Sequence, residues 1–147
     1  MYDYEYDFSI VMGYYNRKKQ VINTLNYFKE NYKKYNFEVI IVDDNSIPEH
    51  NLNDIINDYE YNINYITINK KDKGDRINPS VPYNIGFKNA KGKIVVIQNP
   101  ECIHVGDLLK TLNNKIDENL PTYLKQKFNL LARREACLLY TSDAADE

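Results

Sequence analysis

The chain has 147 residues, of which 43% are hydrophobic and 27% are charged, and its formal net charge is −2. This length suits one domain with one sizeable core, and the composition is that of an ordinary globular protein. A net charge so close to zero gives no electrostatic basis for binding nucleic acid or an anionic membrane.

Targeting and membrane signals are missing from the sequence pattern. No apolar run approaches the roughly 18 residues of a membrane span. Residues 1–7 are acidic and Tyr-rich, unlike a signal peptide. The two cysteines, Cys102 and Cys137, form neither a disulfide framework nor a metal-ligand spacing. We therefore expect a cytoplasmic protein with no integral membrane segment in this chain.

The first half of the chain predicts strands and helices in alternation. Residues 8–12 are a short apolar run rich in β-branched side chains, typical of a buried strand. Residues 17–32 carry apolar side chains at helical spacing. A second strand, hydrophobic on both faces, is expected at 37–42. Apolar residues between 52 and 59 predict a second helix, and residues 63–68 predict a third strand.

The second half continues the alternation. A charged loop is expected over 70–80, followed by a short helix at 81–90 with Gly92 after its end. Residues 93–98 predict a fourth strand, and the apolar spacing over 105–116 predicts a last helix. Strands and helices in this order predict a three-layer α/β domain with a mainly parallel sheet.

Polar residues gather where the predicted strands end. They lie at 13–17, 43–46, 69–76 and 99–104. Ligands of open α/β sheets bind beyond the carboxyl ends of the strands. This concentration is the first functional signal in the sequence.

Two acidic residues, Asp43 and Asp44, follow the second strand. Adjacent carboxylates repel one another and need donors or a cation to remain ionised. In a functional interpretation, one accepts from the N–H of a nucleotide base while the other meets the ribose or a metal. In a structural one, the pair caps the following turn, for which Asp, Asn and Ser are suited.

A second polar group, Asn99, Pro100 and Glu101, follows the fourth strand. The carboxylate of Glu101 and the weaker, neutral carbonyl of Asn99 are oxygen ligands suited to a hard divalent cation. The alternative is a polar turn in which Pro100 ends the strand. His104 is either a further ligand or a hydrogen-bonding surface residue.

Basic and aromatic residues complete the candidates. Arg76, with Lys71 and Lys73 nearby, is suited to phosphate oxygens, although a Lys-rich loop is usually just solvated. Tyr14 and Tyr15 have the rings to stack on a base. In a chain with 14 Tyr, that signal depends on its context.

Three segments in order carry a family resemblance: SIVMGYYNRKKQVINTL at 9–25, EVIIVDDNS at 38–46 and PYNIGFKNAKGKIVVIQNPE at 82–101. Together they resemble the start of a family 2 glycosyltransferase. That family shows a Tyr–Asn turn, an Asp-Asp-x-Ser strand end, and an Asn-x-Gly…Ala-x-Gly helix before its metal motif. The resemblance, which spans about residues 8–112, implies a truncated, Rossmann-like GT-A domain whose nucleotide-sugar-binding part is expected at 8–131.

The resemblance also implies site residues. Tyr15 would lie against the nucleobase, and Asp44 would accept its N–H with Asp43 alongside. Arg76 or a neighbour would face the diphosphate. Asn84 would help to shape the helix beneath the donor pocket. The implied partners are a nucleotide-sugar donor, expected to be a UDP-sugar, and a glycan or lipid-linked acceptor with a free hydroxyl.

The metal motif departs from the family pattern. Glu101 matches the second acid of Asp-x-Asp, but Asn99 replaces the first. The implied cofactor is Mn²⁺ or Mg²⁺, held with one negative charge fewer than usual. Gly13 also stands where Pro is common. The family's catalytic base comes from the second half of the domain, and nothing after Leu112 matches it, so we expect this fragment to be inactive.

The end of the chain differs from the rest in composition. Cys137 to Glu147 resembles the translation of a transposase-type sequencing adapter, and four of the five Ala lie after Leu131. We therefore expect residues 132–147 to be a non-native tail. A genuine amphipathic C-terminal helix is the alternative.

Three other functions remain to be compared. A response-regulator receiver shares the acidic pair, but its phosphoryl-accepting Asp has no counterpart at the strand end with Gln98 and Asn99. A dinucleotide-dependent oxidoreductase requires a Gly-rich turn after the first strand, where bulky rings follow Gly13. A non-catalytic relative that binds a nucleotide-sugar or a partner is the remaining alternative, because Asn99 replaces an acid.

Overall fold

The computed structural model describes residues 4–119, which form an α/β domain around one parallel sheet. The strand order is β3-β2-β1-β4, and every neighbouring pair is parallel. The predicted mainly parallel sheet is thereby confirmed. The strands are β1 (Tyr6–Tyr14), β2 (Phe37–Asp43), β3 (Asn62–Thr67) and β4 (Gly92–Ile97).

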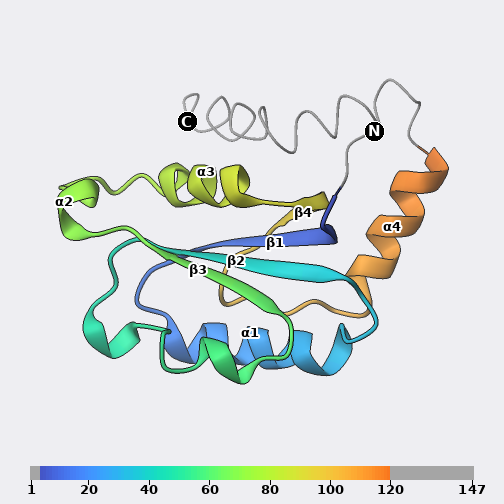
Figure 1. Ribbon diagram of the computed structural model, residues 1–147, viewed down its shortest axis with the longest axis horizontal. Helices are drawn as coiled ribbons and strands as arrows, with labels where there is room; N and C mark the ends of the chain where they lie inside the picture. Colours follow the sequence, from blue (N-terminus) through green and yellow to red (C-terminus); the bar gives the residue numbers. More distant parts are fainter. Residues whose placement is uncertain (1–3, 120–147) are drawn as a thin grey trace.

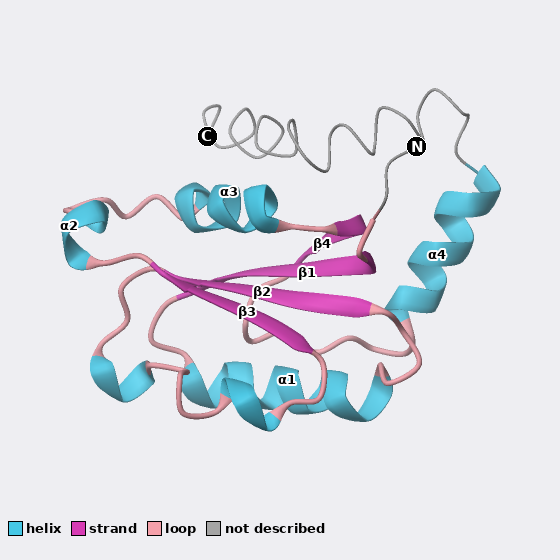
Figure 2. Cartoon of the chain, viewed as in Figure 1, coloured by secondary structure: helices cyan, strands magenta, loops and turns pink. Residues whose placement is uncertain are grey.

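Helices lie on both faces of the sheet, which gives three layers (Figure 1). One face is covered by α1 (Lys18–Asn31) and by two 3₁₀ turns, Pro48–His50 and Ile56–Asp58. The other face is covered by α3 (Ser80–Asn89). Figure 2 shows α2 (Lys70–Lys73) beyond the end at which the strands finish and α4 (Leu108–Asn119) at the opposite end.

The helix predicted between residues 52 and 59 is wrong. Only the 3₁₀ turn Ile56–Asp58 forms there. The apolar stripe reflects burial instead, because Leu52 is fully buried in the core beneath the sheet. Asn51 accepts a hydrogen bond from the backbone N–H of Asn53 at 2.8 Å, and such local bonds from Asn and Asp compete with helix formation. The short helix α2 lies inside the region predicted as a loop.

The central strands bury side chains on both faces. On β1, Ile10 and Met12 belong to the core cluster beneath α1, whereas Val11 belongs to the cluster beneath α3. On β2, Ile41 and Val42 divide in the same way. All seven residues of β2 are buried, as the both-face hydrophobic pattern predicts.

Helix α3 approaches β1 closely through Gly86. A Cβ added to Gly86 would lie 2.3 Å from Cγ1 of Val11. Gly13 of β1 faces the same helix, where a Cβ would lie 3.2 Å from the ring of Tyr83. The two glycines therefore set how near α3, and with it Tyr83, lies to the sheet.

Two of the predicted boundaries lie outside the described residues. The domain end at 131 and the non-native tail at 132–147 therefore stay predictions. Within residues 4–119, no helix has both the length and the apolar character that crossing a membrane requires.

Candidate functional site

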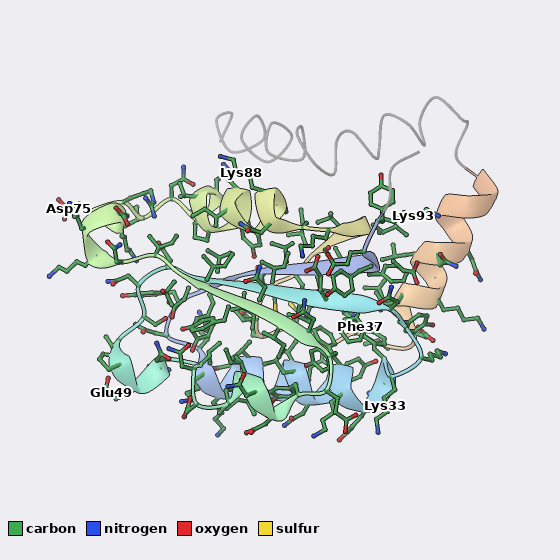
Figure 3. All side chains as sticks on the ribbon, viewed as in Figure 1. Lys33, Phe37, Glu49, Asp75, Lys88 and Lys93 are labelled. Atoms are coloured by element: carbon green, nitrogen blue, oxygen red, sulfur yellow. The ribbon has the colours of Figure 1, made fainter. Side chains whose placement is uncertain are left out.

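A pocket of about 540 Å³ opens at the carboxyl ends of the strands. In Figure 3, Asp75 is labelled near the end at which the strands finish, whereas Phe37 and Lys93 are labelled towards the starts of their strands. The walls of the pocket come from segments far apart in the sequence, because parallel strands end at the same edge. The lining includes Tyr15, Asp44, Lys73, Tyr83, Asn99 and Glu101.

Asp44 is the acidic residue after β2 that lines the pocket. Its side chain is 12% exposed, and both carboxylate oxygens have cationic partners. Nζ of Lys73 lies 3.1 Å from one oxygen, and a terminal nitrogen of Arg76 lies 3.2 Å from the other. Asp44 therefore forms two ion pairs in a largely buried cluster with Lys73 and Arg76.

Asp43 faces away from the pocket into the protein. One of its carboxylate oxygens accepts a hydrogen bond from the backbone N–H of Ser46 at 2.7 Å, and the other accepts one from the hydroxyl of Tyr65. Burial, and then the Asp43 carboxylate, raise the pKa of Tyr65. Asp43 therefore caps the turn after β2, and its predicted contact with a ligand stays a prediction.

The turns after β1 and β2 are fastened together by Asn16 and Ser46. The side chain of Asn16 accepts from the N–H of Ile47, and the hydroxyl of Ser46 accepts from the N–H of Asn16, both at 2.9 Å. Asn16 and Asn45 have φ values of 51° and 64°, a left-handed conformation that Asn tolerates best among residues with a side chain. This arrangement fixes Tyr15 and Asp44, which lie beside these residues.

Tyr15 and Tyr14 have different surroundings. Tyr15 is 51% exposed, and its ring lies 4.2 Å from Nζ of Lys73. Tyr14 is buried, and its hydroxyl donates to the carbonyl of His50 at 2.6 Å. Burial, and then the charge of Asp43, raise the pKa of Tyr14 to about 12. Of the two rings, only that of Tyr15 is exposed enough to receive a flat ligand.

Asn99 and Glu101, which follow β4, supply oxygen atoms to the pocket lining. Both side chains are exposed, and Oδ1 of Asn99 accepts a hydrogen bond from the hydroxyl of Tyr83 at 3.0 Å. Within residues 4–119, no three His, Cys, Asp or Glu side chains gather as a ready-made metal cage. One carboxylate and one amide oxygen fit a cation such as Mg²⁺, which is commonly bound through one or two carboxylates together with substrate phosphates.

Besides Asp43, three candidates lie outside the pocket lining. Arg76 reaches it only through its contact with Asp44. Asn84 lies half-buried on α3. His104 packs instead against Phe28 and Tyr32 of the α1 side, and burial lowers its pKa. Its position favours a packing role.

Tyr83 is a pocket residue that the sequence analysis did not single out. Its ring faces Gly13, and its hydroxyl also lies 3.3 Å from the carbonyl of Gln98. Nothing in the sequence distinguishes it from the other 13 tyrosines apart from its place before Asn84 in the Asn-x-Gly helix.

The three layers, the parallel sheet and the pocket at the strand ends define a GT-A domain of the Rossmann-like type. The chain belongs to the family described as Glycosyl transferase family 2, whose model matches residues 9–128. The resemblance noted in the sequence is therefore confirmed.

Solved structures of S. aureus TarS are similar to this domain. For TarS 1–349, the identity is 25%, the TM-score is 0.63, and the match covers 76% of this chain and 32% of that one. The complex of TarS 1–349 with UDP-GlcNAc gives the same identity and TM-score over 31% of its length. A further TarS crystal structure has a TM-score of 0.58 and is covered over 20% of its length. The chain thus spans a third or less of these proteins. No curated protein sequence matches it.

Proposed function

We propose that the strand-end pocket binds the nucleotide of a UDP-sugar, and that the protein transfers the sugar to a hydroxyl of a glycan or lipid-linked acceptor. The observation that carries this proposal is the convergence of Asp44 and Glu101, from the ends of two different strands, on one pocket of about 540 Å³. The crystal structure of similar TarS with UDP-GlcNAc supports the choice of a uridine nucleotide.

The base is expected at the end formed by Tyr15 and Asp44. The half-exposed ring of Tyr15 offers a stacking surface, and the carboxylate of Asp44, whose side chain is 12% exposed, offers acceptor oxygens for an N–H. Uracil presents one such N–H on its pairing edge. The fastened turns around Asn16 and Ser46 hold these two groups in place before the ligand arrives.

The diphosphate is expected between the base end and Glu101. Lys73 lines this pocket and Arg76 lies against Asp44, so two cations stand near the position of the phosphate charges. Asn99 and Glu101 would hold Mn²⁺ or Mg²⁺, which would neutralise the leaving diphosphate. Asn84 would then act through the position of α3, which carries Tyr83.

A binding protein without transfer is the second candidate. The specific observation in its favour is Asn99, a neutral residue whose side-chain oxygen already accepts from Tyr83. If the protein only binds, the intact protein should bind a UDP-sugar with Mn²⁺ and release no UDP when the acceptor is present. If the protein is a transferase, UDP should be released under the same conditions.

Calorimetry of UDP binding to the full chain, with and without Mn²⁺, tests the proposal. The Asp44→Ala variant is expected to bind UDP at least about tenfold more weakly, because a charge-assisted bond to the base is lost. Asp75→Ala removes the same charge from an exposed position near the same end and is the matched control. Equal UDP affinities of the two variants would contradict the assignment of Asp44.

A further inference from the structure

Lys73 contacts Tyr15 and Asp44, the two residues that are proposed to bind the nucleotide base. Its Nζ contacts the carboxylate of Asp44 at 3.1 Å, the backbone carbonyl of Asp44 at 2.7 Å and the face of the Tyr15 ring at 4.2 Å. A base that stacks on Tyr15 and donates to Asp44 would need the same positions. Lys73 and the base therefore compete.

The competition is strengthened by the surroundings of Lys73. Its side chain is only 17% exposed, and partly desolvated cation–ring and ion-pair contacts are stronger than fully solvated ones. Arg76 contacts the second carboxylate oxygen of Asp44, so each oxygen already has one cationic partner. Among the described residues, Nε of Arg76 is one of two buried side-chain nitrogen or oxygen atoms without a hydrogen-bond partner.

The segment that carries Lys73 is held by few contacts. Helix α2 is a single turn in which Asn69 caps the backbone N–H of Asp72 at 3.0 Å. It ends at Gly74, whose φ is 54° and around which no atom lies within 4 Å of an added Cβ. The long, flexible stem of Lys73 can therefore carry the ammonium to another acceptor without moving the sheet.

We propose that Lys73 is a specificity-determining residue that covers the base end of the pocket until a diphosphate draws its ammonium away. The inference rests on the proposed function and adds selection between ligands to it. A nucleoside must displace Lys73 from these contacts and has no phosphate oxygens to accept a hydrogen bond from the displaced ammonium group. A nucleoside diphosphate supplies phosphate oxygens that accept from Lys73. The site therefore rejects uncharged nucleosides.

Uridine and UDP binding to the full chain, without metal, test this inference. Lys73→Ala is expected to bind uridine about tenfold more tightly than the wild type, because a partly desolvated cation–ring and ion-pair contact of this strength no longer competes. The same variant is expected to bind UDP no more tightly. Lys71→Ala removes an equal charge from an exposed position on α2 and should leave uridine binding unchanged.

A second measurement needs no variant. Lysine methylation followed by mass spectrometry should show Lys73 protected relative to Lys71 in the free protein, and uridine at saturating concentration should raise its reactivity. If UDP binds the wild type but Lys73→Ala leaves the uridine affinity unchanged or lowers it, the inference fails and the donor site stands. Equal reactivity of Lys73 and Lys71 towards methylation in the free protein would also overturn the inference and leave the proposed donor site intact. Absence of any UDP binding overturns both.

Discussion

Replacing Gly86 by alanine tests how α3 is held against the sheet and so how the pocket wall is placed. The new Cβ would lie 2.3 Å from Cγ1 of Val11, about 1 Å inside the ordinary contact range, which begins at 3.4 Å. Val11 is fully buried on β1, a strand paired with neighbours on both sides. It therefore has little room to retreat.

The expected magnitude follows from two opposing effects. Overpacking of a tight core typically costs about 1–3 kcal/mol, and a contact this short belongs at the upper end. Alanine in a helix interior recovers about 0.5–1 kcal/mol relative to glycine. We expect Gly86→Ala to lower the free energy of unfolding by about 2 kcal/mol. Without the close contact, the same change would raise it.

Urea unfolding of four proteins measures the contact directly: wild type, Gly86→Ala, Val11→Ala and the double variant. Val11→Ala alone should cost about 2 kcal/mol through lost burial and a cavity. In the double variant the new methyl enters that cavity, so the loss should be smaller than the sum by at least about 1 kcal/mol. Lys88→Ala on the exposed face of α3 is the control. Additive losses, or a stabilised Gly86→Ala, would refute the packing argument.

Three further predictions concern the site and its supports. Asn99→Asp restores a second carboxylate beside Glu101 and should tighten Mn²⁺ binding to the UDP complex by about tenfold or more, as measured by metal titration in calorimetry. Tyr65→Phe leaves an oxygen of Asp43 without its donor and should lower the free energy of unfolding in urea by about 1–2 kcal/mol. Because burial lowers the pKa of His104, the folded state binds its proton less readily than the unfolded state, so stability should fall as the pH drops below about 6.5, and His104→Gln should reduce that fall.

Each of these predictions has a result that would contradict it. An unchanged Mn²⁺ affinity of Asn99→Asp would mean that residue 99 does not face the cation. An unchanged stability of Tyr65→Phe would mean that water replaces the hydroxyl at Asp43 without loss. A pH dependence of unfolding that is identical with and without His104 would mean that this imidazole stays solvated.

Much of the fold follows from local pattern. Strand β2 is predicted from a run of residues that are apolar on both faces, and helix α1 from apolar residues at helical spacing. The structure confirms both elements. The stripe from Leu52 to Tyr59 satisfies the same period, yet only the 3₁₀ turn Ile56–Asp58 forms there, and just before it Asn51 accepts a local hydrogen bond from the N–H of Asn53. Periodicity reports which residues are buried, and only the backbone hydrogen bonds decide the element.

The site is predictable where it depends on topology and not where it depends on rotamers. That Asp44 and Glu101 share one edge follows from parallel strands ending together. Which of the two adjacent acids faces the pocket cannot be predicted in this way. Adjacent side chains point to opposite sides of a strand end, and the sequence alone does not show that Asp43 turns inward to Tyr65 while Asp44 contacts Lys73. The closeness of Tyr83 to Asn99 depends on Gly86 and the height of α3 above the sheet.

The central claim is that one ligand joins the ends of two strands in this pocket. Nuclear magnetic resonance of the isotopically labelled full chain tests it most directly. UDP should shift the amide signals of Tyr15 and Asp44, and Mn²⁺ added in trace amounts with UDP should broaden the signals of residues 99–102. Shifts centred instead on the pocket beside Phe28 and Asn62, or Mn²⁺ broadening away from Glu101, would contradict the claim.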